Sequence, residues 1–240
     1  MLNLLIYQKV FFVLIVFLFY FVIQSTFMNN KIEKEQLAAI SEMRDMMQRS
    51  SRFLSLSGLA GILVGFVALV GVAIAYYILE MPISSINYLF SLEKTLGTKE
   101  NTLLYIIINC VSVLTLSLTI GTFLAIRNAK RKGLSIGDKT TQRLVINMFI
   151  PLLIGGLFIM ALLFHHQYSL ILPSMLIFYG MALLNASKYS IEDIRYLGII
   201  EMFLGLLSMF LLDQALIIWA IGFGILHMIY GVILYNKYEK

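Results

Sequence analysis

The sequence predicts an all-α fold, a polytopic transmembrane bundle of six helices, and its composition and apolar runs both point that way. Hydrophobic residues make up 60% of the 240 residues and charged residues only 13%, which is too apolar for a water-soluble domain of this size. A helix needs about 20 apolar residues to cross a bilayer. Six runs of about that length define a six-helix transmembrane domain over residues 56–240: about 56–79, 103–126, 144–164, 169–186, 194–212 and 214–235.

A seventh apolar run, at about 10–23, fits this bundle poorly. As a first helix starting in the cytoplasm behind Lys9, it would place the basic segment 28–55 outside and invert each later loop. We therefore expect the native chain to start at Met28, with residues 1–27 as upstream translation. A cleaved signal peptide is the alternative, although residues 24–27 offer no small-residue cleavage site.

Residues 28–55 predict a cytoplasmic amphipathic helix, because apolar side chains recur there at helical spacings among mixed charges. One interpretation is a helix that lies on the inner membrane face or packs under the bundle and binds anionic lipid headgroups. The other is a docking site, at residues 31–54, for a cytoplasmic protein partner or for a second copy of the chain. Both can hold together. The apolar side chains are Leu37, Ile40, Met43, Met47 and Leu54.

The lysines and arginines predict the orientation of the bundle. If the six runs cross in turn, 15 of these residues from Lys31 onward fall on one side, and only Lys94 and Lys99 fall on the other. Basic residues collect on the cytoplasmic side of a membrane. We therefore expect both ends of the six-helix body to lie in the cytoplasm, so the net charge of +5 calls for no nucleic-acid partner.

The last two runs predict a helical hairpin that turns at Asp213 and Gln214. Each carries a stripe of small and polar residues at helical steps, and the residue numbers of facing positions sum to a nearly constant value. This register places Glu201 opposite His227. We expect the glycines above and below the pair to let the two helices approach closely. The stripes are Gly198, Glu201, Gly205 and Ser208 on the first helix, and Ala220, Gly224, His227 and Gly231 on the second.

Gly61 and Gly65 form a GxxxG pair in the first of the six runs. Small residues at this spacing favour close contact between helices. We expect the contact to be with another helix of the same bundle, and homodimerisation is the alternative.

Glu201 and His227 are the candidate intramembrane polar pair. An ionisable side chain at membrane depth is costly, which makes it a candidate functional site. The structural interpretation is a hydrogen bond that fixes the register of the hairpin. The functional interpretation is a proton-sensitive pair, either in a transporter or in a sensor that repacks when His227 becomes charged.

Two stretches of the sequence carry a resemblance to a known family. They are the run from Asn185 to Gly198 with Glu201 behind it, and the run from Trp219 to His227 followed by Tyr230 and Gly231; the stretch from Glu35 to Gly61 adds to them. The chain from about residue 30 to 240 resembles an uncharacterised family of multi-span integral membrane proteins common in Bacteroidota. This resemblance implies a membrane class without an activity, and it is compatible with a start at Met28.

Few residues point to chemistry. Cys110 is the only cysteine, which excludes an intramolecular disulfide, and His165 and His166 lack a metal-ligand spacing such as HExxH. We find no catalytic constellation or nucleotide loop, and we predict no catalytic, cofactor-binding or metal-binding residue. We expect a non-enzymatic sensing, binding or assembly component of the bacterial inner membrane. The alternative is a small proton-sensitive transporter or channel that uses Glu201 and His227.

Overall fold

The structure, a computed structural model, describes Ile40 and residues 57–82, 87–133 and 139–239. The predictions for residues 1–27 and, Ile40 excepted, for residues 28–55 lie outside the described residues. All that follows concerns one compact unit, Arg52–Lys240. The described part of this unit is built of helices and contains no strand, so the predicted all-α bundle is confirmed.

Each of the six predicted runs is helical, and five helical stretches among the described residues are long and apolar enough to cross a membrane. The remaining helix, α7, has 17 residues and extends about 25 Å. Outward-facing side chains such as Leu118 and Leu157 are more than half exposed, which suits lipid better than water. The bounds are α2 Gly58–Ile78, α4 Thr102–Arg131, α5 Lys139–Phe164, α6 Ile171–Ala186, α7 Ile194–Phe210, and, in the last run, α8 Ala215–Trp219, a π-helical segment Ala220–Leu226 and α9 His227–Tyr238.

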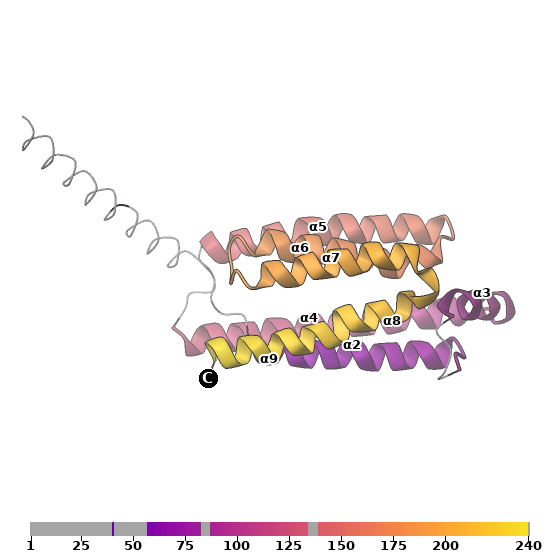
Figure 1. Ribbon diagram of the computed structural model, residues 1–240, viewed down its shortest axis with the longest axis horizontal. Coiled ribbons are helices and arrows are strands. Elements are labelled where there is room, and N and C mark those ends of the chain that lie inside the picture. Colours follow the sequence, from indigo (N-terminus) through magenta and orange to yellow (C-terminus); the bar gives the residue numbers. More distant parts are fainter. Residues whose placement is uncertain (1–39, 41–56, 83–86, 134–138, 240) are drawn as a thin grey trace, which may run out of the picture. The chain divides into compact units, whose positions relative to one another are not determined.

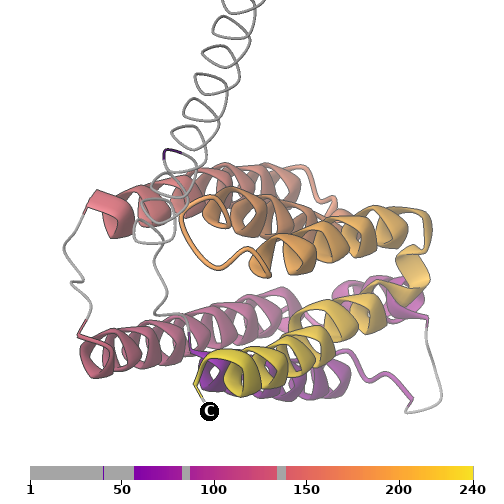
Figure 2. The ribbon, with the colours of Figure 1, turned by 60° about the vertical axis from the view of Figure 1, so that its left-hand side comes forward.

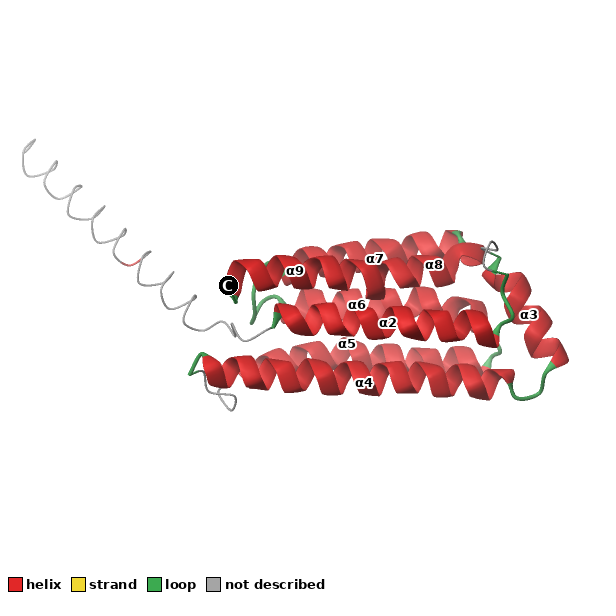
Figure 3. Cartoon of the chain, turned by 90° about the horizontal axis from the view of Figure 1, so that it is seen from below, coloured by secondary structure: helices red, strands yellow, loops and turns green. Residues whose placement is uncertain are grey.

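The five membrane-length stretches and α7, together called the six spans below, form two layers of three helices (Figures 1 and 3). In one layer α2 lies between α4 and α9 and packs along both, and in the other α6 lies between α5 and α7. The last span connects the layers, because α8 and the π-helical segment also contact α6 and α7. A buried apolar cluster that includes Leu176, Leu216 and Trp219 fills this junction.

The first three spans and the last three share one packing arrangement with opposite direction. The central helix α2 packs along the span that follows it, α4, and the central helix α6 packs along the span that follows it, α7. The third span of each half then joins the other layer: α5 packs along α6, and α9 packs along α2 (Figure 2). Because α2 and α6 are three spans apart, the halves run in opposite directions, as in inverted repeats.

The glycines of α7 do not face the last span, so the prediction that the last two spans approach through their glycines is wrong. A Cβ atom added at Gly198 would lie 2.8 Å from the carbonyl oxygen of Gly180, and one added at Gly205 would lie 2.9 Å from the carbonyl oxygen of Pro173. Both neighbours belong to α6. The small residues of α7 therefore serve the contact with α6.

Two glycines of the last span, Gly224 and Gly231, face α2. A Cβ atom added at Gly61 would lie 3.0 Å from the Cα atom of Gly231, and one added at Gly65 would lie 2.5 Å from the carbonyl oxygen of Gly224. The GxxxG pair of α2 thus makes a contact within the bundle, the first of the two predicted alternatives.

The predicted contact fails because the small residues of α7 and of the last span each pack against a different helix. α6 and α2 carry small residues and free backbone surface of their own, so α7 and the last span each settle against a central helix. Between α7 and the last span stands Glu201, whose side chain fills the space beside Gly222. The register of Glu201 and His227 holds without close backbone contact.

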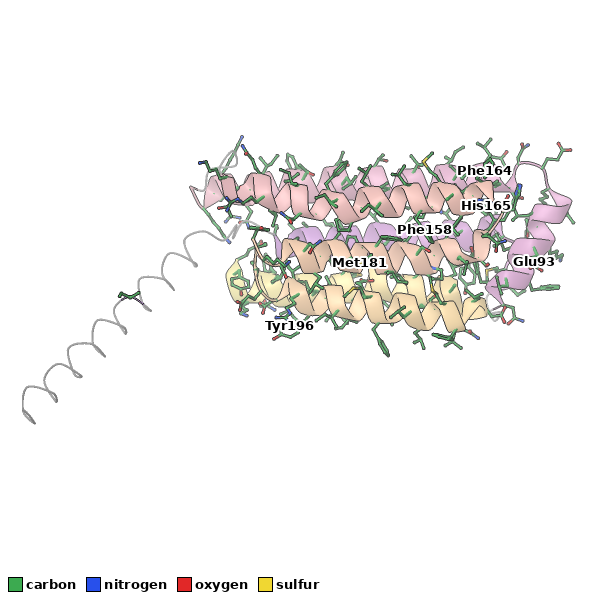
Figure 4. The ribbon with its side chains drawn as sticks, turned by 90° about the horizontal axis from the view of Figure 1, so that it is seen from above. Glu93, Phe158, Phe164, His165, Met181 and Tyr196 are labelled. Carbon is green, nitrogen blue, oxygen red and sulfur yellow. The ribbon has the colours of Figure 1, made fainter. Side chains whose placement is uncertain are left out.

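A short helix, α3 (Tyr88–Thr98), lies at one end of the bundle. Figure 4 shows Glu93 on α3 at this end and Tyr196, in the first turn of α7, at the opposite end. The α3 end also carries an exposed ion pair between Glu80 and Lys99. The hydrogen bond and the charge of the Lys99 ammonium group hold the pKa of the Glu80 carboxyl below its ordinary value.

We expect Lys99→Met to raise the pKa of Glu80 back toward its ordinary value. A carboxyl whose pKa is lowered by folding stabilises the folded state above its unfolded pKa, and this contribution is lost as the pH falls through the folded pKa. The variant should therefore lose a small part of its stability at neutral pH and none in strong acid. A carbon-detected NMR titration of the Glu80 carboxyl checks the shift, with Lys94→Met as the control that should move it less, since the charge of Lys94 makes the smaller contribution.

The two ends of the six-helix unit meet at the end of the bundle opposite α3. The backbone N–H of Gly58 donates a hydrogen bond to the Glu239 carboxylate, and the Ser57 hydroxyl donates a second, longer one. The first N–H groups of a helix lack partners within it and favour a negative charge. The last residues of the unit therefore cap its first helix.

Candidate functional site

Glu201 lies on the buried face of α7 and has no exposed surface. The other residues of that face recur at the same helical steps, so the periodicity of the sequence alone places the carboxyl side chain inside the bundle. Glu201 stands one residue before the midpoint of α7 and is therefore near the middle of the membrane-spanning length. The buried residues of the face are Ile194, Leu197, Gly198, Glu201, Gly205 and Ser208.

His227 is also buried and lies next to Glu201. Its Nδ1 atom is 3.4 Å from Oε1 of Glu201 and 3.0 Å from the carbonyl oxygen of Gly222. Its Nε2 atom is 2.8 Å from the hydroxyl oxygen of Tyr179, which comes from α6. Three spans therefore supply the cluster, and all three side chains stand close to the midpoints of their spans.

The hydrogen bonds of His227 are satisfied by a neutral imidazole. A carbonyl oxygen can only accept, so Nδ1 carries the hydrogen that it donates to Gly222. In the neutral ring Nε2 then accepts from the Tyr179 hydroxyl. A protonated ring would need Tyr179 to accept instead, and the hydroxyl can do so because it both donates and accepts.

The carboxylate of Glu201, by contrast, makes no hydrogen bond with any described residue. The contact with Nδ1 is within the distance of an ion pair, but it lacks hydrogen-bond geometry, and we regard it as a contact between neighbouring charges or dipoles. A buried polar group without a partner is rare and calls for a specific explanation. The structural interpretation, a register-fixing hydrogen bond between Glu201 and His227, therefore lacks its hydrogen bond.

Gly222 provides the space for this carboxylate. A Cβ atom there would lie 2.6 Å from Oε2 of Glu201 and 2.6 Å from Cδ2 of Leu176. Gly222 belongs to the π-helical segment Ala220–Leu226, and such segments within α-helices are frequent at functional sites. Gly222 therefore belongs both to the π-helical interruption and to the site, and His227 follows that interruption directly.

Aromatic rings line the cluster on the side toward α8. The Phe223 ring lies 4.8 Å from the rings of both Trp219 and Tyr179 and stacks on His227 at 5.8 Å, measured between ring centroids. The walls of the site are thus apolar, and charge on Glu201 or His227 is poorly shielded there.

Sequence reasoning found Glu201 and His227 but missed Tyr179 and Gly222. Tyr179 is the only titratable residue of α6. Its place in the middle of an apolar run is the one feature of the sequence that could have identified it. The outer histidines stay apart from the cluster: Nδ1 of His166 lies 2.6 Å from the Tyr168 hydroxyl. No group of three or more metal-ligating side chains occurs among the residues that the structure describes.

Comparisons with known proteins add no relative: no protein family, curated protein or solved structure gave a significant match to the chain.

Proposed function

We propose that this protein is a non-enzymatic, multi-pass component of the bacterial cytoplasmic membrane that senses protonation of the Glu201, His227 and Tyr179 cluster. One observation carries the proposal: the carboxyl group of Glu201 has no exposed surface and no hydrogen-bond partner among the described residues, yet it stands 3.4 Å from an imidazole. A side chain that lowers stability in this way is retained most readily for a function.

The response follows from the charges that the cluster can hold. Glu201 is the only carboxyl group, and His227 the only imidazole, within α6, α7 and the last span. Tyr179 from α6 bonds His227, and Tyr230 lies three residues beyond His227 on α9. From α2, Gly65 and Leu69 lie against the π-helical segment. Protonation therefore changes the net charge of a site in an apolar setting, where charge affects helix packing strongly.

The basic residues favour an orientation with both ends of the six-helix body in the cytoplasm. The contacts of Gly58 and Ser57 with Glu239 support placing both ends on one side. In this orientation residues 31–54, of which the structure describes only Ile40, would carry the response to a cytoplasmic partner.

Infrared difference spectroscopy of the full-length protein in lipid, between acidic and neutral pH, tests the proposal. We expect a band for a protonated carboxyl group in an apolar setting, absent in Glu201→Gln and shifted in His227→Gln. The matched control is Glu93→Gln, which removes an exposed carboxyl group of α3 and should leave the band unchanged. A difference spectrum of Glu201→Gln identical to that of the wild type would refute proton sensing at this site.

A second candidate, a small proton-coupled transporter, is favoured by the inverted arrangement of the two halves. Transporters built this way hold their substrate and coupling-ion sites near the middle of the membrane, between the repeats and beside interrupted helices. The cluster combines residues of α6, α7 and the last span at that depth, next to the π-helical segment. Net proton movement into liposomes under a membrane potential would separate transport from sensing.

A further inference from the structure

A group of polar side chains at the surface lies at the same end of the bundle as the contact of Gly58 and Ser57 with Glu239. The Asp193 carboxylate, just before α7, is 2.7 Å from Nζ of Lys237 and 3.0 Å from the Tyr238 hydroxyl. The side chain of Lys237 is about half exposed, and that of Asp193 is partly exposed. This group of three side chains, which we call the Asp193 group, is in contact with water.

Tyr230 lies on α9 between His227, which belongs to the buried cluster, and Tyr238, which belongs to the Asp193 group. It follows His227 by three residues on α9, or about 4.5 Å along the helix axis. Its hydroxyl group is buried and has no hydrogen-bond partner among the described residues. Tyr179, Tyr230 and Tyr238 all pack against one apolar cluster around Leu183 and Ile191.

Of these three tyrosines, Tyr179 and Tyr238 already have hydrogen-bond partners for their hydroxyl groups. That of Tyr179 bonds His227, and that of Tyr238 donates to Asp193. The Tyr230 hydroxyl has no such partner among the described residues. A hydroxyl group can accept one hydrogen bond while it donates another. We propose that Tyr230 relays protons between the Asp193 group and the Glu201, His227 and Tyr179 cluster. This inference rests on the proposed function.

The relay leaves Tyr230 chemically unchanged. A proton from the solvent first binds the Asp193 carboxylate. The Tyr230 hydroxyl then gives its own proton toward Tyr179 and His227 and takes the proton from Asp193, directly or through a bridging water. The cluster gains one proton, and Asp193 is a carboxylate again. No other group changes.

Toward the opposite end of the bundle, the described residues include two further buried polar groups. Ser208 and Trp219 also have buried polar atoms without partners among the described residues. The Trp219 indole, however, can only donate a hydrogen bond and cannot pass a proton on. The Phe223 ring packs against both the Trp219 ring and the His227 ring. The relay through Tyr230 uses the Asp193 end, where the Asp193 group is partly exposed, and the proposed orientation puts that end in the cytoplasm.

Tyr230→Phe tests the relay because it removes only the unpartnered hydroxyl. After a light-triggered proton release, the rise of the Glu201 carboxyl band in full-length protein in lipid nanodiscs gives the rate at which the cluster is protonated. We expect the variant to slow this rate at least about tenfold, as for the loss of a positioned proton-transfer group, and to leave the final amplitude unchanged. The matched control is Tyr235→Phe, since Tyr235 lies on the same helix and is exposed.

Asp193→Asn serves as a second variant at the entrance and should also slow the rate without changing the amplitude. A wild-type rate in Tyr230→Phe would overturn the relay while leaving the proposed function intact, and a lost amplitude would make Tyr230 part of the cluster and overturn it as well. The absence of any Glu201 band in the wild type would instead refute the proposed function.

Discussion

Gly231→Ala should destabilise the protein by about 3 kcal/mol, because overpacking a tight contact commonly costs about 1–3 kcal/mol and backbone atoms cannot move aside easily. The added Cβ atom would lie 2.6 Å from the carbonyl oxygen of Gly58 and 2.6 Å from the backbone nitrogen of Ile62. The variant would have to push α9 away from α2. Reversible unfolding in mixed micelles measures the loss.

The matched control is Gly121→Ala on α4, where an added Cβ atom meets nothing within 4 Å. Alanine has the higher helix propensity by up to about 1 kcal/mol, so the control should be neutral or slightly stabilising. Equal stabilities for the two variants would show that α2 and α9 are not in close contact.

Glu201→Met should stabilise the folded protein at neutral pH by about 2 kcal/mol and abolish the proton response. Replacing buried ionic groups by apolar side chains of similar volume is often neutral or stabilising, by about 1–4 kcal/mol. The carboxyl group makes no hydrogen bond with a described residue, so none is lost. His227 keeps its bonds to Tyr179 and Gly222.

The sign of this change also reports the charge of His227. If the imidazole were protonated at neutral pH, removing Glu201 would leave an unpaired buried charge and would destabilise the protein by about 3–5 kcal/mol. Micelle unfolding at neutral and acidic pH distinguishes the cases, and Glu93→Met provides an exposed control. A destabilised Glu201→Met at neutral pH would contradict a neutral His227 and favour a structural ion pair.

The spans could be predicted from the sequence because membrane insertion depends on local apolar length. The run predicted at 56–79 corresponds to α2, Gly58–Ile78, and the turn predicted at Asp213 and Gln214 is a 3₁₀ turn, Leu212–Gln214. Helical periodicity likewise identified the buried positions Glu201 and His227. These features are set within one or two neighbouring helices.

The partners of the helices could not be predicted, because small residues favour close packing without naming the partner. Gly198 and Gly231 match each other in spacing, yet each fits a central helix better. Tyr179 was missed for the same reason, since its contact with His227 depends on where α6 lies. The inverted arrangement is likewise a matter of packing, and no internal similarity of residues accompanies it.

The exchange of third helices between the layers has a consequence for biosynthesis. α2 is the first of the described spans to leave the ribosome, and its glycine-lined face packs on α9, which is the last. That face must meet lipid until synthesis is nearly complete. A prematurely terminated chain would therefore expose an open groove along α2, a mark by which membrane quality control can recognise it.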